Sequence, residues 1–255
     1  MARETFTGTA WITGAGTGIG RGLALALAAR GMTVAASART EADLVSLAAE
    51  ARPGAILPVP LDVTDEAAVG AAVTRIEAEA GPITLAILNA GTNSEVSAQK
   101  FDTARFAHVV DTNLMGAVHC LGALLPLLRQ RRAGRVAVVA SVAGYRGLPT
   151  SSAYAASKAG LIAMTESLKP ELEADHVELT LINPGFVDTP LTRKNTFPMP
   201  FLIDNDEAVR AIIGGLERGR FEIVFPWQMS LAMKILGSLP YGPFFAITRR
   251  MVRRL

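Results

Sequence analysis

Short apolar runs alternate with stretches of helical periodicity from the first residues of the chain, and this alternation constrains the fold more than any other feature. The runs have the length and continuous hydrophobicity of buried strands. Successive β-α-β units of this size imply a parallel sheet with helices on both of its faces. We therefore expect an α/β fold in three layers, α/β/α, around a doubly wound parallel sheet. The predicted strands of this part are Thr9–Thr13, Thr33–Ser37, Ala55–Pro60 and Thr84–Leu88, and the helices between them are Arg21–Arg30, Glu41–Ala51 and Asp65–Ala80.

The second half of the chain continues the pattern with a long apolar helix, Thr103–Leu128. Pro126 lies inside this helix and is expected to bend or end it, since proline lacks the backbone N–H that a helix interior needs. Further strands are predicted at Arg135–Ala140, Val177–Ile182 and Phe221–Phe225.

Length and composition favour one domain over residues 1–255, since no repeat, linker or low-complexity segment divides the chain. The 25 basic and 23 acidic residues give no sign of nucleic-acid binding. A single cysteine, Cys120, excludes an intrachain disulfide and suits a reducing compartment. The opening MARETFTGTA has no apolar signal core, and no uncharged, proline-free apolar stretch reaches the roughly 20 residues of a spanning helix. A cytoplasmic protein is expected.

A glycine-rich turn, GAGTGIG, lies directly between the first strand and the first helix. Its spacing differs from the commonest dinucleotide fingerprint, because Ile19 and Arg21 stand where the third glycine would be. Small residues at this place let backbone N–H groups approach a pyrophosphate at a helix N-terminus. We expect nucleotide binding rather than a plain connector, through Gly14, Gly16, Thr17, Gly18, Ile19 and Gly20.

The end of the second strand indicates which dinucleotide is bound. A ribose-binding acid is expected about 20 residues after the first glycines, but the sequence there is Ser37-Ala38-Arg39-Thr40, and the first acid is Glu41. A serine and an arginine favour a 2′-phosphate, which a carboxylate would repel. We expect NADP(H) rather than NAD(H), with Ser37 and Arg39 on the phosphate. The alternative is that Arg39 is an ordinary surface arginine beside a helix.

Tyr154 and Lys158 lie four residues apart in an Ala/Ser-rich segment, so both side chains share one helix face. Ser141 follows the predicted strand Arg135–Ala140 and can meet them. A phenol beside a cation is favoured as phenolate, which brings its pKa nearer the range of a general acid or base. The alternative, a packed tyrosine and a solvated lysine, would be preferred for the Tyr-x-x-x-Lys motif alone.

Five motifs together resemble the short-chain dehydrogenase/reductase family. In chain order they are Thr13–Gly20, Asn89-Ala90-Gly91, Ser141, Tyr154-x-x-x-Lys158 and Pro184-Gly185. The resemblance extends from about Thr9 to about Thr189. It implies a Rossmann fold that carries cofactor and substrate sites together, and NADP(H)-dependent hydride transfer to or from a carbonyl or secondary alcohol.

The resemblance also implies roles for single residues. Asn113, Ser141, Tyr154 and Lys158 match the family's catalytic residues, and Asn113 would anchor a water in a proton relay. Packing of Asn113 inside the fold, with its amide satisfied there, is the alternative for that residue. Residues matched to the cofactor are Asp62 and Val63 at the adenine, Asn89, Ala90 and Gly91 along the ribose, Tyr154 and Lys158, and Pro184, Gly185, Val187 and Thr189 near the nicotinamide.

The segment at residues 186–205 matches the family's substrate lid. Its apolar residues, with those after Ser141, suggest a hydrophobic substrate, although packing of the lid itself is an equal alternative. These residues are Val142, Tyr145, Leu148, Phe186, Phe197, Met199, Phe201, Leu202 and Ile203, and Thr92 and Asn93 can add polar contacts. His108, His119 and His176 lack metal-ligand spacing, so no metal is expected.

The last segment, residues 226–255, is apolar, contains Pro226, Pro240 and Pro243, and ends in arginines. It can cover the substrate pocket, form a subunit interface in a homodimer or homotetramer, or lie on an anionic membrane. The first two are favoured, because prolines disrupt a continuous amphipathic helix. Besides an NADP(H)-dependent carbonyl reductase, two functions stay open, a 3-oxoacyl-thioester reductase and a non-catalytic NADP-sensing protein. The tail weakens the former and the intact set of catalytic residues weakens the latter.

Overall fold

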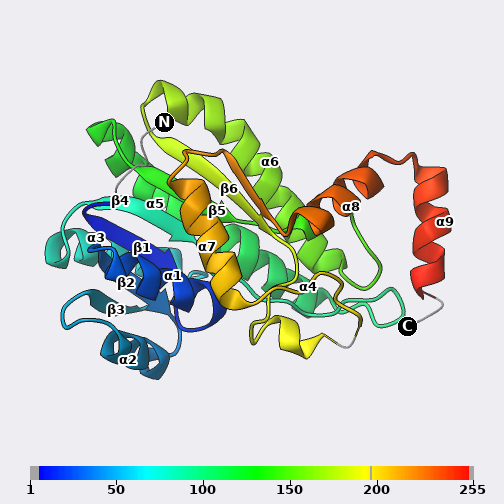
Figure 1. Cartoon of the computed structure of the whole chain (residues 1–255), viewed down its shortest axis with the longest axis horizontal. Helices are drawn as coiled ribbons and strands as arrows, with labels where there is room; N and C mark the ends of the chain where they lie inside the picture. Colours follow the sequence, from blue (N-terminus) through cyan, green and yellow to red (C-terminus); the bar gives the residue numbers. More distant parts are fainter. Residues whose placement is uncertain (1–5, 196, 253–255) are drawn as a thin grey trace.

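A seven-stranded sheet, with every pairing parallel, forms the middle layer of the molecule (Figure 1). The computed structural model describes residues 6–195 and 197–252. The strand order is β3-β2-β1-β4-β5-β6-β7, which reverses direction between β1 and β4. The strands are β1 (Thr9–Thr13), β2 (Thr33–Ala38), β3 (Ile56–Pro60), β4 (Ile83–Leu88), β5 (Arg135–Val139), β6 (Glu178–Pro184) and β7 (Glu222–Phe225). The predicted doubly wound parallel sheet is confirmed.

Helices cover both faces of this sheet. On one face α1, α2 and α7 pack, and on the other α3, α5 and α6. The helices are α1 (Gly18–Ala29), α2 (Glu41–Glu50), α3 (Glu66–Glu79), α4 (Thr103–Val110), α5 (Gly116–Arg131), α6 (Ser152–Ala174), α7 (Asn205–Leu216), α8 (Trp227–Ser238) and α9 (Tyr241–Val252). Short turns are the π-helical η1 (Asp111–Met115) and the 3-10 turns η2 (Val142–Gly144) and η3 (Thr192–Lys194).

Most strand residues are apolar and buried because the sheet has a helix layer on both faces. In β1, Ile12 belongs to the core under α1 and α7, while Trp11 belongs to the core under α3, α5 and α6. Both side chains are fully buried. Successive residues of a strand point to opposite faces, so a strand between two helix layers needs apolar residues at every position. The buried sheet holds the carboxyl ends of its strands in a fixed line.

The long predicted helix is divided into α4, η1 and α5 by a π-helical turn, which the sequence did not indicate. Of the two effects predicted for Pro126, ending the helix is contradicted, because α5 continues to Arg131. By length and composition Thr103–Arg131 is apolar enough to span a membrane. Its apolar side chains Leu121, Leu124 and Leu128 are buried in the core against the sheet.

The segment after β7 forms two helices. Pro226 precedes α8, Pro240 separates α8 from α9, and Pro243 lies in the first turn of α9. Proline is tolerated at such places, where no intrahelical donor is missing. Figure 1 shows α8 beside the sheet edge at β7 and α9 extending from the body. The prolines therefore set the ends of helices in this segment instead of preventing them.

Candidate active site

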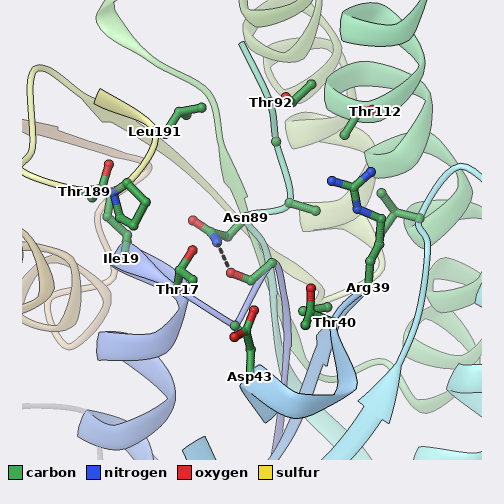
Figure 2. A pocket seen from close by; sticks show the side chains of 18 of the residues that line it. Thr17, Ile19, Arg39, Thr40, Asp43, Asn89, Thr92, Thr112, Thr189 and Leu191 are labelled. Carbon is green, nitrogen blue, oxygen red and sulfur yellow. Dashed lines mark hydrogen bonds between the residues drawn. The ribbon is translucent and has the colours of Figure 1, made fainter. Parts of the chain in front are cut away.

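A cavity of about 270 Å³ lies at the carboxyl ends of β1, β2, β3 and β4, where the strand order reverses. Ligands of open α/β sheets bind at this place. In Figure 2 it reaches from Arg39 and Thr40 past Asn89 to Thr189 and Ile19. Of the predicted cofactor residues, the cavity is lined by Gly14, Gly16, Thr17, Gly18, Ile19, Arg39, Asp62, Val63, Asn89, Ala90, Gly91 and Thr189. Gly20, Ser37, Tyr154, Lys158, Pro184, Gly185 and Val187 are outside this lining.

The glycine turn fits closely against the segments that follow β4 and β6. Gly14 has φ +66°, and a Cβ there would be 2.8 Å from the Cα of Ala90. Gly18 has φ +53°, and its Cβ would be 3.1 Å from a Thr189 carbon. Side chains at either position would meet strain and fill the floor of the cavity. The space above the turn therefore stays open only with glycine at these two positions, and we call this turn the glycine cradle.

Gly20 serves packing rather than lining. A Cβ at this residue would be 2.3 Å from the carbonyl oxygen of Gly14. The absent side chain lets the first turn of α1 lie against the glycine turn, which is the role of the third glycine in dinucleotide motifs.

The N-terminus of α1 points into the cavity without a side-chain cap. Thr17 precedes the helix in extended conformation, and its hydroxyl makes no capping hydrogen bond. The first N–H groups of a helix carry a partial positive charge and need an acceptor. A phosphate at this end of the cavity would supply it.

Asn89 ties the carboxyl end of β4 to the glycine turn. Its amide nitrogen donates to the carbonyl oxygens of Thr13 and Gly14, each at 3.1 Å. Its backbone N–H donates to the Thr13 hydroxyl at 3.0 Å. Asn89 thereby fixes the floor of the cavity.

The predicted contact of Ser37 with the cofactor is wrong. Ser37 is 1% exposed, and its hydroxyl accepts a 3.0 Å hydrogen bond from the Trp11 indole on the α3/α5/α6 side of the sheet. Alternation along β2 turns residue 37 away from the cavity. Arg39 and Thr40 follow the strand and line the cavity, as does Asp43 in the first turn of α2.

Asp62 begins the turn after β3, where the cavity meets Leu61 and Val63. Its carboxylate accepts hydrogen bonds from the backbone N–H of Thr64 at 3.0 Å and from the Thr64 hydroxyl at 2.8 Å. The first of these bonds is the main cause that holds the pKa of Asp62 below its ordinary value. The site thus presents an ionised acceptor at neutral pH.

Ser141, Tyr154 and Lys158 converge beside the end of β5. Ser141 precedes η2, and its hydroxyl donates to the carbonyl oxygen of Pro184 at 3.2 Å. Tyr154 lies in the first turn of α6, near enough to Ser141 for that hydroxyl to lower the pKa of the phenol. One turn later, the Lys158 ammonium donates to the carbonyl oxygen of Val139 at 2.9 Å and lies 5.6 Å from the Tyr154 ring centroid.

Burial controls the ionisation of both groups. Burial raises the pKa of Tyr154, and the Ser141 hydroxyl opposes this rise. Burial lowers the pKa of Lys158 to about 8. The prediction that the neighbouring cation draws the tyrosine toward phenolate is therefore wrong for this arrangement, in which desolvation is the largest effect on both groups.

Asn113 lies in the π-helical turn η1 and is 1% exposed. Its amide nitrogen donates to the Thr92 carbonyl oxygen and to the Ser157 hydroxyl, each at 3.0 Å, and its oxygen accepts from the Thr92 N–H at 2.7 Å. The side chain is thus satisfied within the fold. A Cβ at Gly91 would be 3.3 Å from the Asn113 oxygen and 3.7 Å from the Lys158 ammonium, so the missing side chain keeps the space between them open.

The segment after β6 contributes differently from what the sequence predicts. Pro184 offers its carbonyl oxygen to Ser141, and a Cβ at Gly185 would lie 3.1 Å from atoms of Pro226 and Met229. Val187 is buried and bridges Ile203. Neither Gly185 nor Val187 lines the cavity, so both are placed as packing residues, and only Thr189 reaches the cavity wall.

An apolar cluster follows Ser141 in the sequence, and a second cavity shares a residue with the first. Val142, Tyr145, Leu148 and Phe186 pack together, and α8 closes the cluster with Met229 and Met233. The second cavity, about 120 Å³, shares Leu191 with the first. Its lining is more polar than the sequence predicts: Asn93, Glu95, Thr150, Ser151, Lys194, Asn195 and Phe197. Phe201 and Leu202, predicted at the substrate, are 49% and 44% exposed and line neither cavity.

With this geometry in place, comparison with known families identifies the chain. The family model described as short chain dehydrogenase matches residues 8–198, which is most of the chain. The chain belongs to the short-chain dehydrogenase/reductase family. As a member of this family, the protein is an oxidoreductase. Its structure has a doubly wound sheet, and its helix α6 carries the Tyr-x-x-x-Lys motif.

Known relatives agree with this membership. The short-chain dehydrogenase is 41% identical over 245 residues to an uncharacterized oxidoreductase of Myxococcus xanthus, covering 95% of this chain and 97% of the relative. It is 34% identical to the 3-oxoacyl-[acyl-carrier-protein] reductase MabA of Mycobacterium avium, over 64% of this chain and 66% of that protein. A solved short chain dehydrogenase of Burkholderia cenocepacia, in complex with NADP, superposes with a TM-score of 0.81 at 29% identity, covering 92% of this chain and 94% of the other.

Sequence reasoning did not find several residues of the first cavity. Thr40, Asp43 and Thr112 line it, and the Thr112 hydroxyl is buried without a hydrogen-bond partner. Asp43 and Thr112 lie on helices, one turn into α2 and within η1. Only the position of these helix ends over the sheet brings them to the cavity. For Thr40 there was a signal, since it follows Arg39 directly after β2.

Proposed function

We propose that this protein is an NADP(H)-dependent oxidoreductase that interconverts a carbonyl and a secondary alcohol. The observation that carries the proposal is that Lys158, one helical turn after Tyr154, lies next to Gly91 in the lining of a cavity whose floor is a glycine cradle. Membership of the short-chain dehydrogenase/reductase family supports it. A proton donor next to a dinucleotide site is what carbonyl reduction requires.

The residues of the first cavity fit a dinucleotide. The uncapped N-terminus of α1 offers N–H groups to a pyrophosphate, and the cradle at Gly14 and Gly18 is one that a Cβ would fill. The unpartnered Thr112 hydroxyl provides a further polar contact. The nicotinamide cofactor, when bound, supplies or accepts the hydride.

A 2′-phosphate is the ligand we propose for Arg39. Arg39 lines the cavity next to Thr40, and its guanidinium helps to lower the pKa of the Asp62 carboxyl in the same lining. A guanidinium and a hydroxyl are suited to a phosphate. The complex of the Burkholderia relative with NADP supports this choice.

The chain's own groups divide the proton chemistry. Burial keeps the phenol of Tyr154 protonated at neutral pH, the form that donates to a carbonyl oxygen. Ser141 positions that oxygen by a hydrogen bond, and Lys158 supplies positive charge in a buried site. Asn113 holds Thr92 and Ser157 and so fixes α6 against the loop after β4.

Replacement of Tyr154 by Phe tests the proposal. We expect kcat for NADPH-dependent reduction of a panel of ketones and aldehydes to fall about 10²- to 10⁴-fold, because the proton donor is lost. NADPH affinity, measured by fluorescence titration, should change by less than a few fold. Tyr241→Phe, at an exposed tyrosine of α9, is the matched control and should keep kcat. Near-normal turnover of Tyr154→Phe would remove the assignment. A protein that binds NADPH and turns over no carbonyl would instead be a nucleotide sensor.

A 3-oxoacyl thioester is the second substrate class, favoured by the 34% identity to the MabA reductase. The polar second cavity, with Lys194 and Asn93, accommodates the polar groups of such a chain better than a purely apolar pocket would. Rates of NADPH oxidation with acetoacetyl-CoA and with cyclic or aromatic ketones of similar size distinguish the two classes. A preference of tenfold or more for the thioester would assign the protein to acyl-chain reduction.

A further inference from the structure

The helices α8 and α9 expose apolar side chains that nothing else in the fold requires. Of the fourteen large apolar residues that are exposed within residues 6–195 and 197–252, eight lie on these two helices. They are Trp227, Leu231, Ile235, Tyr241, Phe245, Ile247, Met251 and Val252. A soluble monomer seldom gathers exposed apolar groups in this way without an interaction to serve.

The α8 helix has two apolar faces. Met229 and Met233 face the body and are buried against Tyr145 and its neighbours. Trp227, Leu231 and Ile235, spaced by four residues, form the opposite stripe and are 68%, 53% and 56% exposed. Packing of the fold explains the first face and leaves the second uncovered.

The α9 helix is anchored by one edge only. Phe244 is buried, and the Arg146 guanidinium lies 4.4 Å from its ring centroid and 4.8 Å from that of Tyr241. Tyr241 and Phe245 stack at 5.7 Å and stay 69% and 47% exposed. Figure 1 shows α9 standing away from the three-layer body, and no other described helix or strand lies along its outer side.

The charge of this segment is one-sided. Residues 226–255 contain Lys234, Arg249, Arg250, Arg253 and Arg254 and no acidic residue, which gives a net charge of +5. Since the chain as a whole has +2, residues 1–225 carry −3. Positive charge and exposed apolar stripes are thus concentrated together, away from the acidic remainder.

We propose that α8 and α9 form a surface that binds anionic lipid membranes. The apolar stripes would enter the boundary between headgroups and acyl chains, where tryptophan and tyrosine are favoured, while the arginines contact lipid phosphates. A negative bilayer attracts the four arginines of this segment, whose fifth cation, Lys234, is paired with Glu222 at 2.8 Å, and it repels the acidic remainder of the chain, which orients the molecule. A protein surface would need acidic side chains to balance the same charges, whereas an anionic bilayer supplies phosphates at any position.

This surface adjoins the substrate side of the candidate active site. Met229 and Met233 of α8 pack on Val142 and Tyr145, close in sequence to Ser141. A membrane-bound molecule would hold that side of the crevice near the bilayer, so a lipophilic carbonyl would enter from the membrane. This last step rests on the proposed function, whereas lipid binding itself does not.

Vesicle binding tests the surface, with tryptophan emission as the readout. The chain has two tryptophans, and Trp11 is fully buried whereas Trp227 is 68% exposed. Vesicles of 30% phosphatidylglycerol in phosphatidylcholine should shift the emission to shorter wavelength and pellet the protein, and pure phosphatidylcholine should bind at least tenfold more weakly. The Trp227→Phe variant should lose the emission shift. Added salt should weaken binding.

Two variants with matched controls separate the apolar and the charged parts. Leu231→Ser/Ile235→Ser and Arg249→Glu/Arg250→Glu should each weaken vesicle binding at least tenfold. Val45→Ser, an equally exposed apolar site on α2, and Arg52→Glu/Lys100→Glu, an equal charge change elsewhere, should alter it less than twofold.

Three results would overturn the proposal. One is no binding of the wild type to anionic vesicles, and another is equal loss in variants and controls. The third is a change of oligomeric state in the tail variants, measured by light scattering, without vesicle binding, which would assign the surface to a second copy of this chain. Because none of these readouts involves turnover, they stand apart from the test of Tyr154.

Discussion

At the scale of single residues, Lys158 is a lysine whose ammonium group is removed from water by the fold. It is 3% exposed, and its ammonium has the Val139 carbonyl oxygen as hydrogen-bond acceptor. Burial lowers its pKa from 10.5 to about 8. A buried lysine with this pKa disfavours the folded state below pH 8, where the group must stay charged. Because the buried lysine lowers the stability of the fold, its presence is better explained by a role in the proposed reaction.

The pH dependence of stability tests this description. Between pH 8 and 10.5 the unfolded chain binds a proton at Lys158 that the folded chain releases, so folded stability rises with pH in this window. The free energy of unfolding of the wild type minus that of Lys158→Met should increase by about 2 kcal/mol from pH 7 to pH 10. Urea titrations at both pH values give this difference, and the variant cancels the other titrating groups. A constant difference would mean that Lys158 keeps its ordinary pKa.

Replacing Arg39 is expected to change the choice between NADPH and NADH, whereas replacing Ser37 is not. Arg39 lines the cavity, whereas Ser37 is buried against Trp11. We expect Arg39→Asp to lower the ratio of kcat/KM for NADPH to that for NADH about 100-fold, because a charged hydrogen bond is replaced by repulsion.

Ser37→Ala is the matched control and should leave this ratio unchanged while it lowers stability through the lost bond with Trp11. If the wild type already prefers NADH, the 2′-phosphate assignment fails.

At the scale of elements, the packing of α1 on the glycine turn depends on a missing atom. A Cβ at Gly20 would lie 2.3 Å from the Gly14 carbonyl oxygen, whereas a Cβ at Gly70, inside α3, would meet nothing within 4 Å. We expect Gly20→Ala to cost about 1–3 kcal/mol of stability and to weaken dinucleotide binding, because α1 must move. Gly70→Ala should stabilise the protein by about 0.5–1 kcal/mol.

Thermal unfolding and NADPH titration of the two variants check this pair. Equal effects would mean that helix propensity, and not contact with the turn, determines the need for glycine.

The turn η1 positions two side chains, Asn113 and Thr112, at the candidate active site. The π-helical turn interrupts an otherwise continuous helix at Asp111–Met115 and carries Asn113 to Thr92 and Ser157. Such turns often occur at functional sites. Here the turn also brings Thr112 to the wall of the cofactor cavity.

At the scale of the whole molecule, the sheet separates two cores of similar kind. Leu27 of α1 lies in one and Leu124 of α5 in the other, and both are fully buried. Each replacement by Ala should cost about 2–5 kcal/mol, because a cavity is left in a packed interior. The costs should add in the double variant, since the two sites share no partner. Urea unfolding of the single and double variants measures this, and a strongly non-additive result would contradict two independent cores.

The alternation of strands and helices was readable in the sequence because each element is a local pattern of apolar residues. β1 was predicted with its observed bounds. The spacing of Tyr154 and Lys158 fixed their common face in the same way, since four residues make about one helical turn.

Only the tertiary structure decided what depends on distance between elements. It turned Ser37 into the core and brought Asp43 and Thr112 to the cavity. It also showed that the prolines of the tail mark the ends of two helices, α8 and α9. Burial also lowered the pKa of Lys158 and raised that of Tyr154. The charged neighbour alone would have lowered the pKa of the tyrosine. Sequence spacing determines which side chains share a face, whereas desolvation and contact depend on everything packed around them, and that is a property of the fold alone.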